Sequence, residues 1–430
     1  MISMLVQAFD NIVDSRFRCH AFENALTQFS MAFSLQTRSD AVGAGTGVGM
    51  NALTFQILVG EKNFEKADRT ASNAAFLYGL SYLVFLILGF TVVKPFYASQ
   101  VHNADPEILK FGIEYLSTVM IFSFGLLGQF FFERLLTSTG KTIFSMTSQL
   151  CGAITNIILD PILIFGLFGA PKMGVTGAAV ATVIGQCVAC IVAGIFNHKF
   201  NHEVRLSFRG FRPDLKIIGH IYAVGIPSII MQSISSIMTY CMNLILVQFT
   251  VTATAVFGVY FKLQSFFFML VFGLNNGITP IIAYNYGARH RKRMLKTVQS
   301  QHVHRILFYI IGFLAFEFIP KHCWGCSVLP KICLPSESLH FYHRNPLSDR
   351  MVCIIAGTVF QALGKAVFSM IVSIMRQLFV LVPAAYILAS IGGLHAVWWS
   401  FPIAEIISLI VSVAFLVVIN RTIIQKIPEA

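Results

Sequence analysis

Residues 143–168 read IFSMTSQLCGAITNIILDPILIFGLF, and residues 176–196 read TGAAVATVIGQCVACIVAGIF. Each run is at least as long as the roughly 20 apolar residues that an α-helix needs to cross a bilayer. The only charged side chain in the two runs is Asp160. Lipid cannot satisfy backbone polar groups, so each run must form a helix if it lies in a membrane. The two runs therefore predict a pair of transmembrane helices joined by a short loop.

The composition extends this interpretation to the whole chain. Residues of the AVILMFWYC set make up 56% of the 430 positions, and charged residues make up 12%. A soluble domain carries roughly 25% charged residues and could not bury so much apolar surface. The runs are continuous, whereas a transmembrane barrel would show alternation. We therefore predict an all-α polytopic membrane protein, with the lipid bilayer as its partner. The chain is long enough for about twelve transmembrane helices.

Twelve apolar runs can be distinguished along the chain. Three of them, 1–14, 24–57 and 351–363, are weaker because they are short or contain charged residues. The nine clear runs are 74–98, 111–133, 143–168, 176–196, 217–249, 253–284, 303–319, 367–390 and 396–419.

Basic residues follow every second run, whereas the loops after the seventh and eleventh runs carry no charge. Proteins with many spans place excess Lys and Arg in their cytoplasmic loops, so both termini are expected in the cytoplasm. The net charge of +12 then belongs to these loops, and we expect no nucleic acid partner. The basic positions are Lys62, Lys66, Arg69, Arg134, Lys141, Lys199, Arg205, Arg209, Arg212, Lys216, Arg289, Arg291, Lys292, Arg293, Lys296, Lys365, Arg421 and Lys426.

An internal repeat divides the chain. TGKTIFSM at 139–146 matches LGKAVFSM at 363–370, and the apolar run after each has a proline near its middle, Pro161 and Pro383. The offset is about half the chain length, so we expect two pseudo-symmetric six-helix lobes. Their predicted bounds are 1–196 and 217–430, with a basic cytoplasmic linker at 197–216. Parallel repeats of this kind are typical of transporters, in which one half rocks against the other around the substrate path.

Cysteine and histidine spacing indicates neither a disulfide framework nor a metal site. The nine cysteines are scattered, and the group Cys323, Cys326, Cys333, His340 and His343 does not match the spacing of a common zinc site. The sequence has no His-rich box, nucleophile elbow or phosphate-binding loop. We therefore expect no metal, no cofactor and no enzymatic activity.

Several stretches resemble the multidrug and toxic compound extrusion (MATE) family, in its DinF-like bacterial branch. The resemblance implies a twelve-helix, two-lobe antiporter in the bacterial inner membrane that exports organic cations and drugs in exchange for protons or sodium. It suggests no obligate protein partner. The stretches are NIVD (11–14), NIILDP (156–161), GAAVAT (177–182), VGIPSIIMQS (224–233), YFKLQSF (260–266), GLNNGITPIIAYNYGA (273–288) and FPIAEI (401–406).

Two parts of the chain depart from this family pattern. Family members begin further upstream, so the first helix is expected to be truncated at Met1. Parts of 15–58 and the stretch 321–350 carry charge where the alternating pattern requires none. One hypothesis is that compensating frameshifts altered these stretches, and a non-functional truncated relic is then an alternative to an active transporter.

Asp160 is the leading candidate for an ion-coupling residue, because charged side chains at bilayer depth usually mark an ion or substrate path. Asn156 lies one turn earlier on the same helix face, and Pro161 removes a backbone donor beside it. Asp14 and Thr182 come from other helices of the same half. The resemblance implies that positions matching these four form a cation site in the N-terminal lobe. A carboxyl group there could exchange a proton or bind sodium through oxygen ligands. The alternative is a purely structural Asp that bonds a neighbouring backbone.

The second half offers candidates for a substrate cavity. Interhelical hydrogen bonding is the alternative role for the amides among them. Glu405 is the only acid in the last run and is expected to be either a second proton or cation site or an interfacial residue. Arg376 could pair with an acid or extend toward a membrane edge. The cavity candidates are Gln232, Asn243, Lys262, Gln264, Asn275, Asn276 and Glu405.

Two other functions compete with a cation-coupled exporter. A lipid-linked oligosaccharide flippase of the same superfamily would need several cationic side chains in its cavity for a pyrophosphate. The acidic candidates of the first half favour small-molecule organic cations as cargo instead. A membrane enzyme has no supporting motif.

Overall fold

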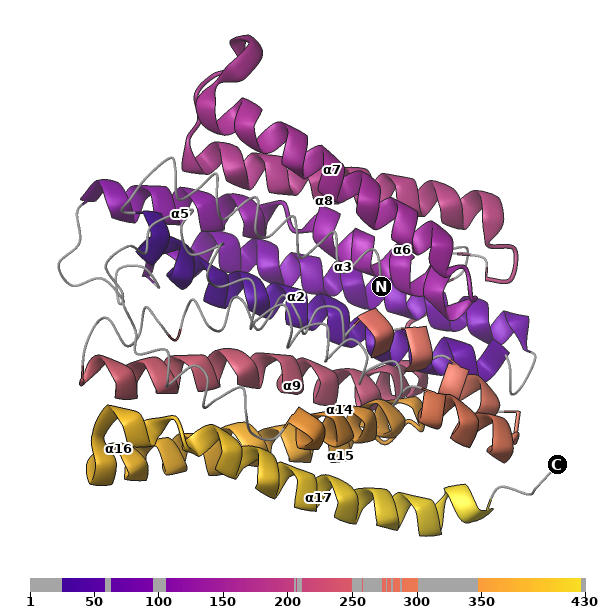
Figure 1. The fold of residues 1–430 in the computed structure, drawn as a ribbon. Coiled ribbons are helices and arrows are strands. Elements are labelled where there is room, and N and C mark those ends of the chain that lie inside the picture. Colours follow the sequence, from indigo (N-terminus) through magenta and orange to yellow (C-terminus); the bar gives the residue numbers. More distant parts are fainter. Residues whose placement is uncertain are drawn as a thin grey trace. The chain divides into compact units, whose positions relative to one another are not determined.

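The computed structural model describes residues 25–58, 63–95, 106–204, 206, 211–249, 257, 273–275, 277–279, 281–286, 288–300 and 347–426. Every regular element in these ranges is a helix. The chain is therefore an all-α membrane protein, as predicted (Figure 1). The chain divides into two compact units, Met1–Ile229 and Ile230–Ala430. The predicted lobe boundary at 197–216 stays a prediction.

Unit 1 contains α2 (Ala25–Gln56), α3 (Phe64–Thr91), α5 (Pro106–Ile121), α6 (Phe124–Ser138), α7 (Thr142–Phe165), η2 (Leu167–Gly169), α8 (Val175–Phe200) and the first part of α9 (Leu215–Val247). Helices α7 and α8 run side by side, and α8 also packs against α6 and α5 (Figure 1). A core of buried aliphatic and aromatic side chains, with Tyr115, Leu116, Leu127 and Leu135 among them, joins α5 and α6 to their neighbours. Helices α7 and α8, which carry the candidate residues Asn156, Asp160 and Thr182, are therefore part of a helical bundle.

Unit 2 contains the rest of α9, then α14 (Leu347–Ala362), α15 (Ala366–Ile374), η4 (Met375–Leu381), α16 (Val382–Val397), α17 (Ser400–Thr422) and η5 (Ile424–Lys426). The segment η4 is π-helical and continues α15 into α16. Helix α17 packs against α14, η4 and α16. The aromatic rings of Phe360, Phe368 and Phe415 lie against one another in its core.

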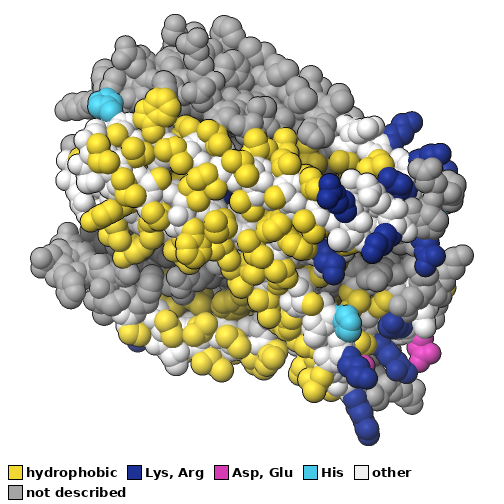
Figure 2. Space-filling model, turned by 90° about the horizontal axis from the view of Figure 1, so that it is seen from below, with side chains coloured by type: hydrophobic (Ala, Val, Ile, Leu, Met, Phe, Trp, Pro, Cys, Tyr) yellow, Lys and Arg dark blue, Asp and Glu magenta, His cyan; other side chains and the backbone are white. Residues whose placement is uncertain are grey.

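Six helices within the described ranges are long and apolar enough to cross a membrane, and a seventh span is possible if one bent pair is counted. The bent pair joins Gly112–Ile121 to Phe124–Ser138 at 45°. Large apolar side chains such as Leu83, Ile87, Phe90 and Ile410 are exposed on the outer helix faces, as lipid contact requires. Hydrophobic side chains dominate the face drawn in Figure 2, and Lys and Arg gather at one of its edges. The prediction of twelve helices extends beyond the described residues.

Local sequence sets the helix ends. The side chain of Asn63 caps α3 by accepting a hydrogen bond from the backbone N–H of Lys66 at 3.0 Å, which satisfies one of the donors left free in a first turn. Helix α7 ends at Gly166, whose φ of 75° is the left-handed conformation that glycine adopts without strain.

The repeated Gly-Lys sequence forms the same turn in both units. Gly140 and Gly364 have φ values of 78° and 71°. The backbone N–H of Lys141 donates to the carbonyl of Leu136 at 2.8 Å, and that of Lys365 donates to the carbonyl of Phe360 at 2.8 Å. This is the hydrogen bond of a glycine-terminated helix. The two sequence repeats thus share a backbone geometry as well as residues.

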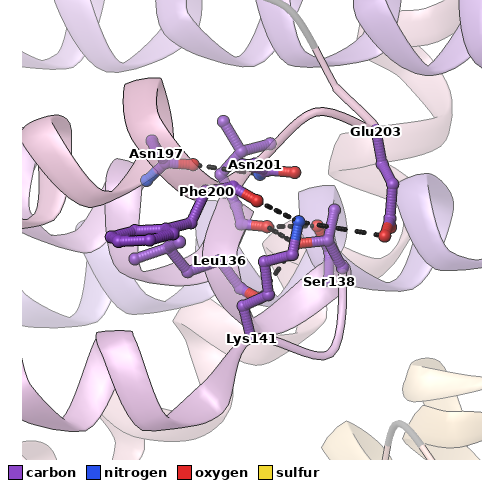
Figure 3. Close-up of polar contacts among 9 residues, drawn as sticks. Leu136, Ser138, Lys141, Asn197, Phe200, Asn201 and Glu203 are labelled. Carbon is purple, nitrogen blue, oxygen red and sulfur yellow. Dashed lines mark hydrogen bonds and ion pairs between the residues drawn. The ribbon is translucent and has the colours of Figure 1, made fainter.

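Lys141 also connects this turn to the end of α8 (Figure 3). Its Nζ donates to the carbonyl oxygen of Phe200, the last residue of α8, and lies 3.8 Å from Oε1 of Glu203. A cation at a helix C-terminus satisfies orphan carbonyls and interacts favourably with the helix dipole. The α6–α7 turn is therefore fixed to the start of the predicted linker.

We expect Lys141→Met to destabilise unit 1 by about 0.5–1 kcal/mol, since the C-terminus of α8 loses its cation. The matched control is Lys365→Met, because Lys365 occupies the same turn in unit 2 with an exposed side chain. Thermal unfolding of the purified protein measures both. Equal melting temperatures for the two variants would contradict the anchoring role.

Candidate functional site

Helices α7 and α8 approach each other closely at two glycines. A Cβ added at Gly152 would lie 2.8 Å from the carbonyl oxygen of Gly185, and a Cβ added at Gly185 would lie 2.8 Å from the carbonyl oxygen of Gly152. Small residues allow this backbone approach, as is common between membrane helices. The contact holds the polar residues one and two turns further along α7 against α8.

Three of the four predicted ion-coupling residues come together at this helix pair. Asp160 is 1% exposed and Asn156 is 7% exposed, both on α7. With its amide assigned by the hydrogen-bond network, the nitrogen of Asn156 donates to Oδ2 and Oδ1 of Asp160 at 3.0 and 3.1 Å. The other amide atom lies 3.4 Å from Oγ1 of Thr182 on α8. A carboxyl, an amide and a hydroxyl group are thus contiguous inside an apolar bundle.

Pro161 lies inside α7 directly after Asp160. Proline has no N–H, so the helix lacks one backbone hydrogen bond beside the carboxyl group. Oγ1 of Thr182 donates to the carbonyl of Ala178 at 2.9 Å, which holds the hydroxyl against its own helix. The site therefore combines the hydroxyl group of Thr182, which is held on α8, with a turn of α7 that lacks one backbone hydrogen bond.

The remaining predicted site residues belong to unit 2 or lie outside the described part of the chain. Gln232 and Asn243 are half-buried on α9. Asn275 is half-buried, and its carbonyl accepts a hydrogen bond from Thr279 at 2.7 Å. The residues outside the described ranges are Asp14, Lys262, Gln264 and Asn276.

Glu405 is buried on α17 and pairs with an arginine. Nη1 of Arg376, on η4, lies 3.1 Å from Oε1 of Glu405. The side chain of Glu405 is 6% exposed and that of Arg376 is 29% exposed. Arg376 therefore pairs with an acid, which is the first of the two alternatives predicted for it, rather than extending toward a membrane edge.

A further buried acid, Glu133 on α6, was not among the predicted site residues. It is 4% exposed, and it accepts hydrogen bonds from Nε2 of Gln129 at 2.8 Å and from Nε2 of Gln149 at 2.6 Å. The two glutamines come from α6 and α7, so the carboxyl group links these helices. The signal in the sequence was an acid four residues after a glutamine inside an apolar run, a pattern that fits one helix face.

No group of three or more His, Cys, Asp or Glu side chains among the described residues could hold a metal ion. Cys187 and Cys190 on α8 are free thiols packed near Gly125 and Gly128 of α6. The cysteines and histidines from Cys323 to His343 lie outside the described ranges.

Comparison with known proteins places these features in a family. The MatE family model matches residues 1–162 and 227–327. The multidrug export protein MepA of Staphylococcus aureus (strain N315) is 26% identical over 379 residues, covering 87% of this chain and 82% of MepA. MepA of Staphylococcus haemolyticus (strain JCSC1435) is 27% identical, covering 85% of this chain and 77% of that protein.

Solved structures share the fold. A multidrug resistance MATE family transporter of the MOP superfamily in an outward-facing conformation superposes with a TM-score of 0.89 at 22% identity, covering 99% of this chain and 94% of that chain. The MATE multidrug transporter DinF-BH gives a TM-score of 0.86 at 28% identity, covering 98% of this chain and 93% of that chain. Since the family model matches more than half of the residues, the apolar helical bundle with its buried Asp160 is that of a multi-pass membrane protein belonging to the MatE family.

Proposed function

We propose that this chain exports organic cations and drugs in exchange for protons or sodium, by alternating access between its two lobes. The names of the MepA relatives and of the DinF-BH structure support multidrug transport as the activity. The proposal places the protein in a bacterial cytoplasmic membrane with both termini on the cytoplasmic side, as the basic loops favour.

The observation that carries the proposal is the hydrogen bonding of Asn156 to buried Asp160, with Oγ1 of Thr182 3.4 Å from the other amide atom of Asn156. A carboxylate removed from water is costly unless its surroundings compensate the charge. Asn156 and Thr182 contribute dipoles but no charge, whereas a proton or a sodium ion at Asp160 would neutralise the carboxylate. Asp, Asn and Thr offer only oxygen ligands to a cation, which suits sodium. The same carboxyl group suits a proton.

The missing backbone hydrogen bond at Pro161 suggests how ion binding biases the helix. A turn that lacks one hydrogen bond can adopt alternative geometries at lower cost than an intact turn. Neutralising Asp160 changes the relative free energies of these geometries, because burial disfavours only the charged form of the carboxyl group. Ion binding and a shift of α7 relative to α8 are then linked in one equilibrium.

Accumulation of a fluorescent organic cation in an efflux-deficient bacterial host tests the proposed function. We expect cells that express the chain to accumulate less of the dye than cells without it. We also expect a protonophore or a sodium ionophore to abolish the difference, depending on which ion couples transport. Equal accumulation with the protein present in the membrane would contradict export of organic cations.

Thr182→Val is expected to reduce efflux about 3- to 10-fold, because the site loses one polar group worth about 0.6–1.4 kcal/mol. Thr155→Val is the matched control on α7, since Oγ1 of Thr155 also donates to the carbonyl four residues earlier, that of Cys151, at 2.7 Å. Initial dye-efflux rates at equal membrane abundance compare the two. A larger loss for Thr155→Val than for Thr182→Val would argue against the assigned role of Thr182.

A further inference from the structure

One face of α17 forms a polar seam inside unit 2. Glu405, Ser408 and Ser412 are buried on this face, at 5%, 1% and 0% exposure. Ile406 and Ile410 are exposed at 49% and 63% on the outer face. The outer face of the helix is apolar, whereas the buried face carries these three polar side chains beside apolar ones such as Phe401 and Ala404. Polar and charged side chains buried in an apolar helix are the ones that mark an ion or substrate path.

Two neighbouring elements contribute to this seam. The segment η4 supplies Arg376, whose Nη1 lies 3.1 Å from Oε1 of Glu405. Helix α14 supplies Cys353, whose Sγ accepts a hydrogen bond from Oγ of Ser408 at 3.3 Å. Arg376 and the thiol of Cys353 are thus the charged and titratable groups that these two elements bring to Glu405 in the described part of unit 2. Gln377 adds a buried amide from η4.

Stability does not explain an ion pair in this place. Desolvating two charges costs about as much as their attraction returns, and well-packed apolar replacements are often equally stable. Charged pairs inside membrane segments are rare and accompany ion or substrate paths. Arg376 also lies in a π-helical segment, a local geometry that is frequent at functional sites. Two independent features thus associate the pair with function.

The two partners differ in exposure, which suggests which one moves. Glu405 is almost fully enclosed on a regular α-helix, whereas Arg376 retains 29% of its side-chain exposure. A long arginine side chain can turn its charged end outward while its stem stays packed. Of the two partners, Arg376 is therefore the one that can leave the pair with less repacking, because its side chain is the more exposed.

We propose that Arg376 is an internal counter-cation of Glu405, which a monovalent organic cation displaces when it binds in unit 2. The inference rests on the proposed function, since it assigns cationic cargo to this site. Binding exchanges one positive charge for another at Glu405, so the buried carboxylate stays neutralised throughout. Return of Arg376 to Glu405 then favours release of the cargo.

Equilibrium binding of a fluorescent rhodamine cation to the purified full chain, followed by fluorescence polarisation, tests this proposal. We expect Arg376→Gln to tighten binding about 10-fold, because the competing cation is gone. We expect Glu405→Gln to weaken binding about 10-fold, and the double variant to behave like Glu405→Gln. Arg421→Gln, at an exposed position near the end of α17, is the control for a nonspecific loss of positive charge.

The outcomes separate the counter-ion role from a structural pair. A structural pair predicts that both single variants lower the melting temperature, that the double variant restores it, and that Arg376→Gln does not tighten binding. Unchanged or weaker binding by folded Arg376→Gln would overturn the counter-ion role while leaving the proposed function intact. If Arg376→Gln does not fold, Glu405→Gln decides, since unchanged binding by that variant would overturn the role. A parent chain that binds no organic cation would overturn both proposals.

Discussion

Replacing Asp160 with asparagine is expected to lower efflux of an organic cation by more than about 10-fold, to the level of a host without the chain, because the site loses its only ionisable member among the three assembled residues. The substitution keeps the shape of the side chain and its polar contact with Asn156, whose amide nitrogen lies 3.0 Å from Oδ2 of Asp160. It removes the group that a proton or sodium ion would neutralise. Export and ion coupling should therefore disappear together, with the protein still in the membrane.

The matched control for this prediction is Glu65→Gln. Glu65 is an exposed acid at the start of α3 that pairs with Arg69 on the same helix. Exposed pairs of this kind contribute little to stability, so this variant should transport like the parent. Membrane abundance is measured by immunoblot for all variants. Efflux retained by Asp160→Asn at equal abundance would remove Asp160 from the coupling site.

Gly152→Ala is expected to destabilise unit 1 by about 1–3 kcal/mol, the usual cost of forcing atoms into a well-packed contact. The new Cβ would lie 2.8 Å from the carbonyl oxygen of Gly185. A backbone atom cannot rotate away, so α7 and α8 must separate. The separation would also move Asn156 and Asp160 relative to Thr182, and efflux should fall along with the melting temperature.

The control for this prediction is Gly79→Ala on α3, where an added Cβ would meet nothing within 4 Å. Alanine is the better helix former, by roughly 0.5–1 kcal/mol at an open helical position. Thermal unfolding in detergent should therefore show a lower melting temperature for Gly152→Ala and an unchanged or higher one for Gly79→Ala. A Gly152→Ala variant as stable as the parent would show that the helices do not meet at these glycines.

The positions of three helices were closely predictable from hydropathy alone. The runs 143–168, 176–196 and 217–249 correspond to α7, α8 and α9 within a few residues. What hydropathy could not show is how a run is interrupted. The run 111–133 contains a 45° bend between two helices, and the run 367–390 contains the π-helical η4. Both depend on backbone hydrogen bonding and packing, which residue polarity does not report.

The candidate site was predictable only along one helix. Asn156 and Asp160 are four residues apart, so helical geometry alone places them on one face. Thr182 on α8 lies next to Asn156 because of how α7 and α8 are aligned along each other. The close contact at Gly152 and Gly185 sets this alignment, and the spacing of residues within α7 does not reveal it. The pairing of Arg376 with Glu405 depends in the same way on how η4 packs against α17. For Glu133, the hydrogen bond from Gln129 fits helical spacing, whereas the one from Gln149 could not be predicted because Gln149 comes from another helix.

Ion-driven transport in proteoliposomes tests the central claim most directly. The purified chain is reconstituted, and uptake of a fluorescent organic cation is followed under an imposed proton gradient, an imposed sodium gradient, or neither. We expect uptake by the parent chain to require one of the two gradients, and we expect uptake to be lost in Asp160→Asn. Uptake at the same rate without any gradient, or with Asp160→Asn, would contradict ion-coupled export through this site.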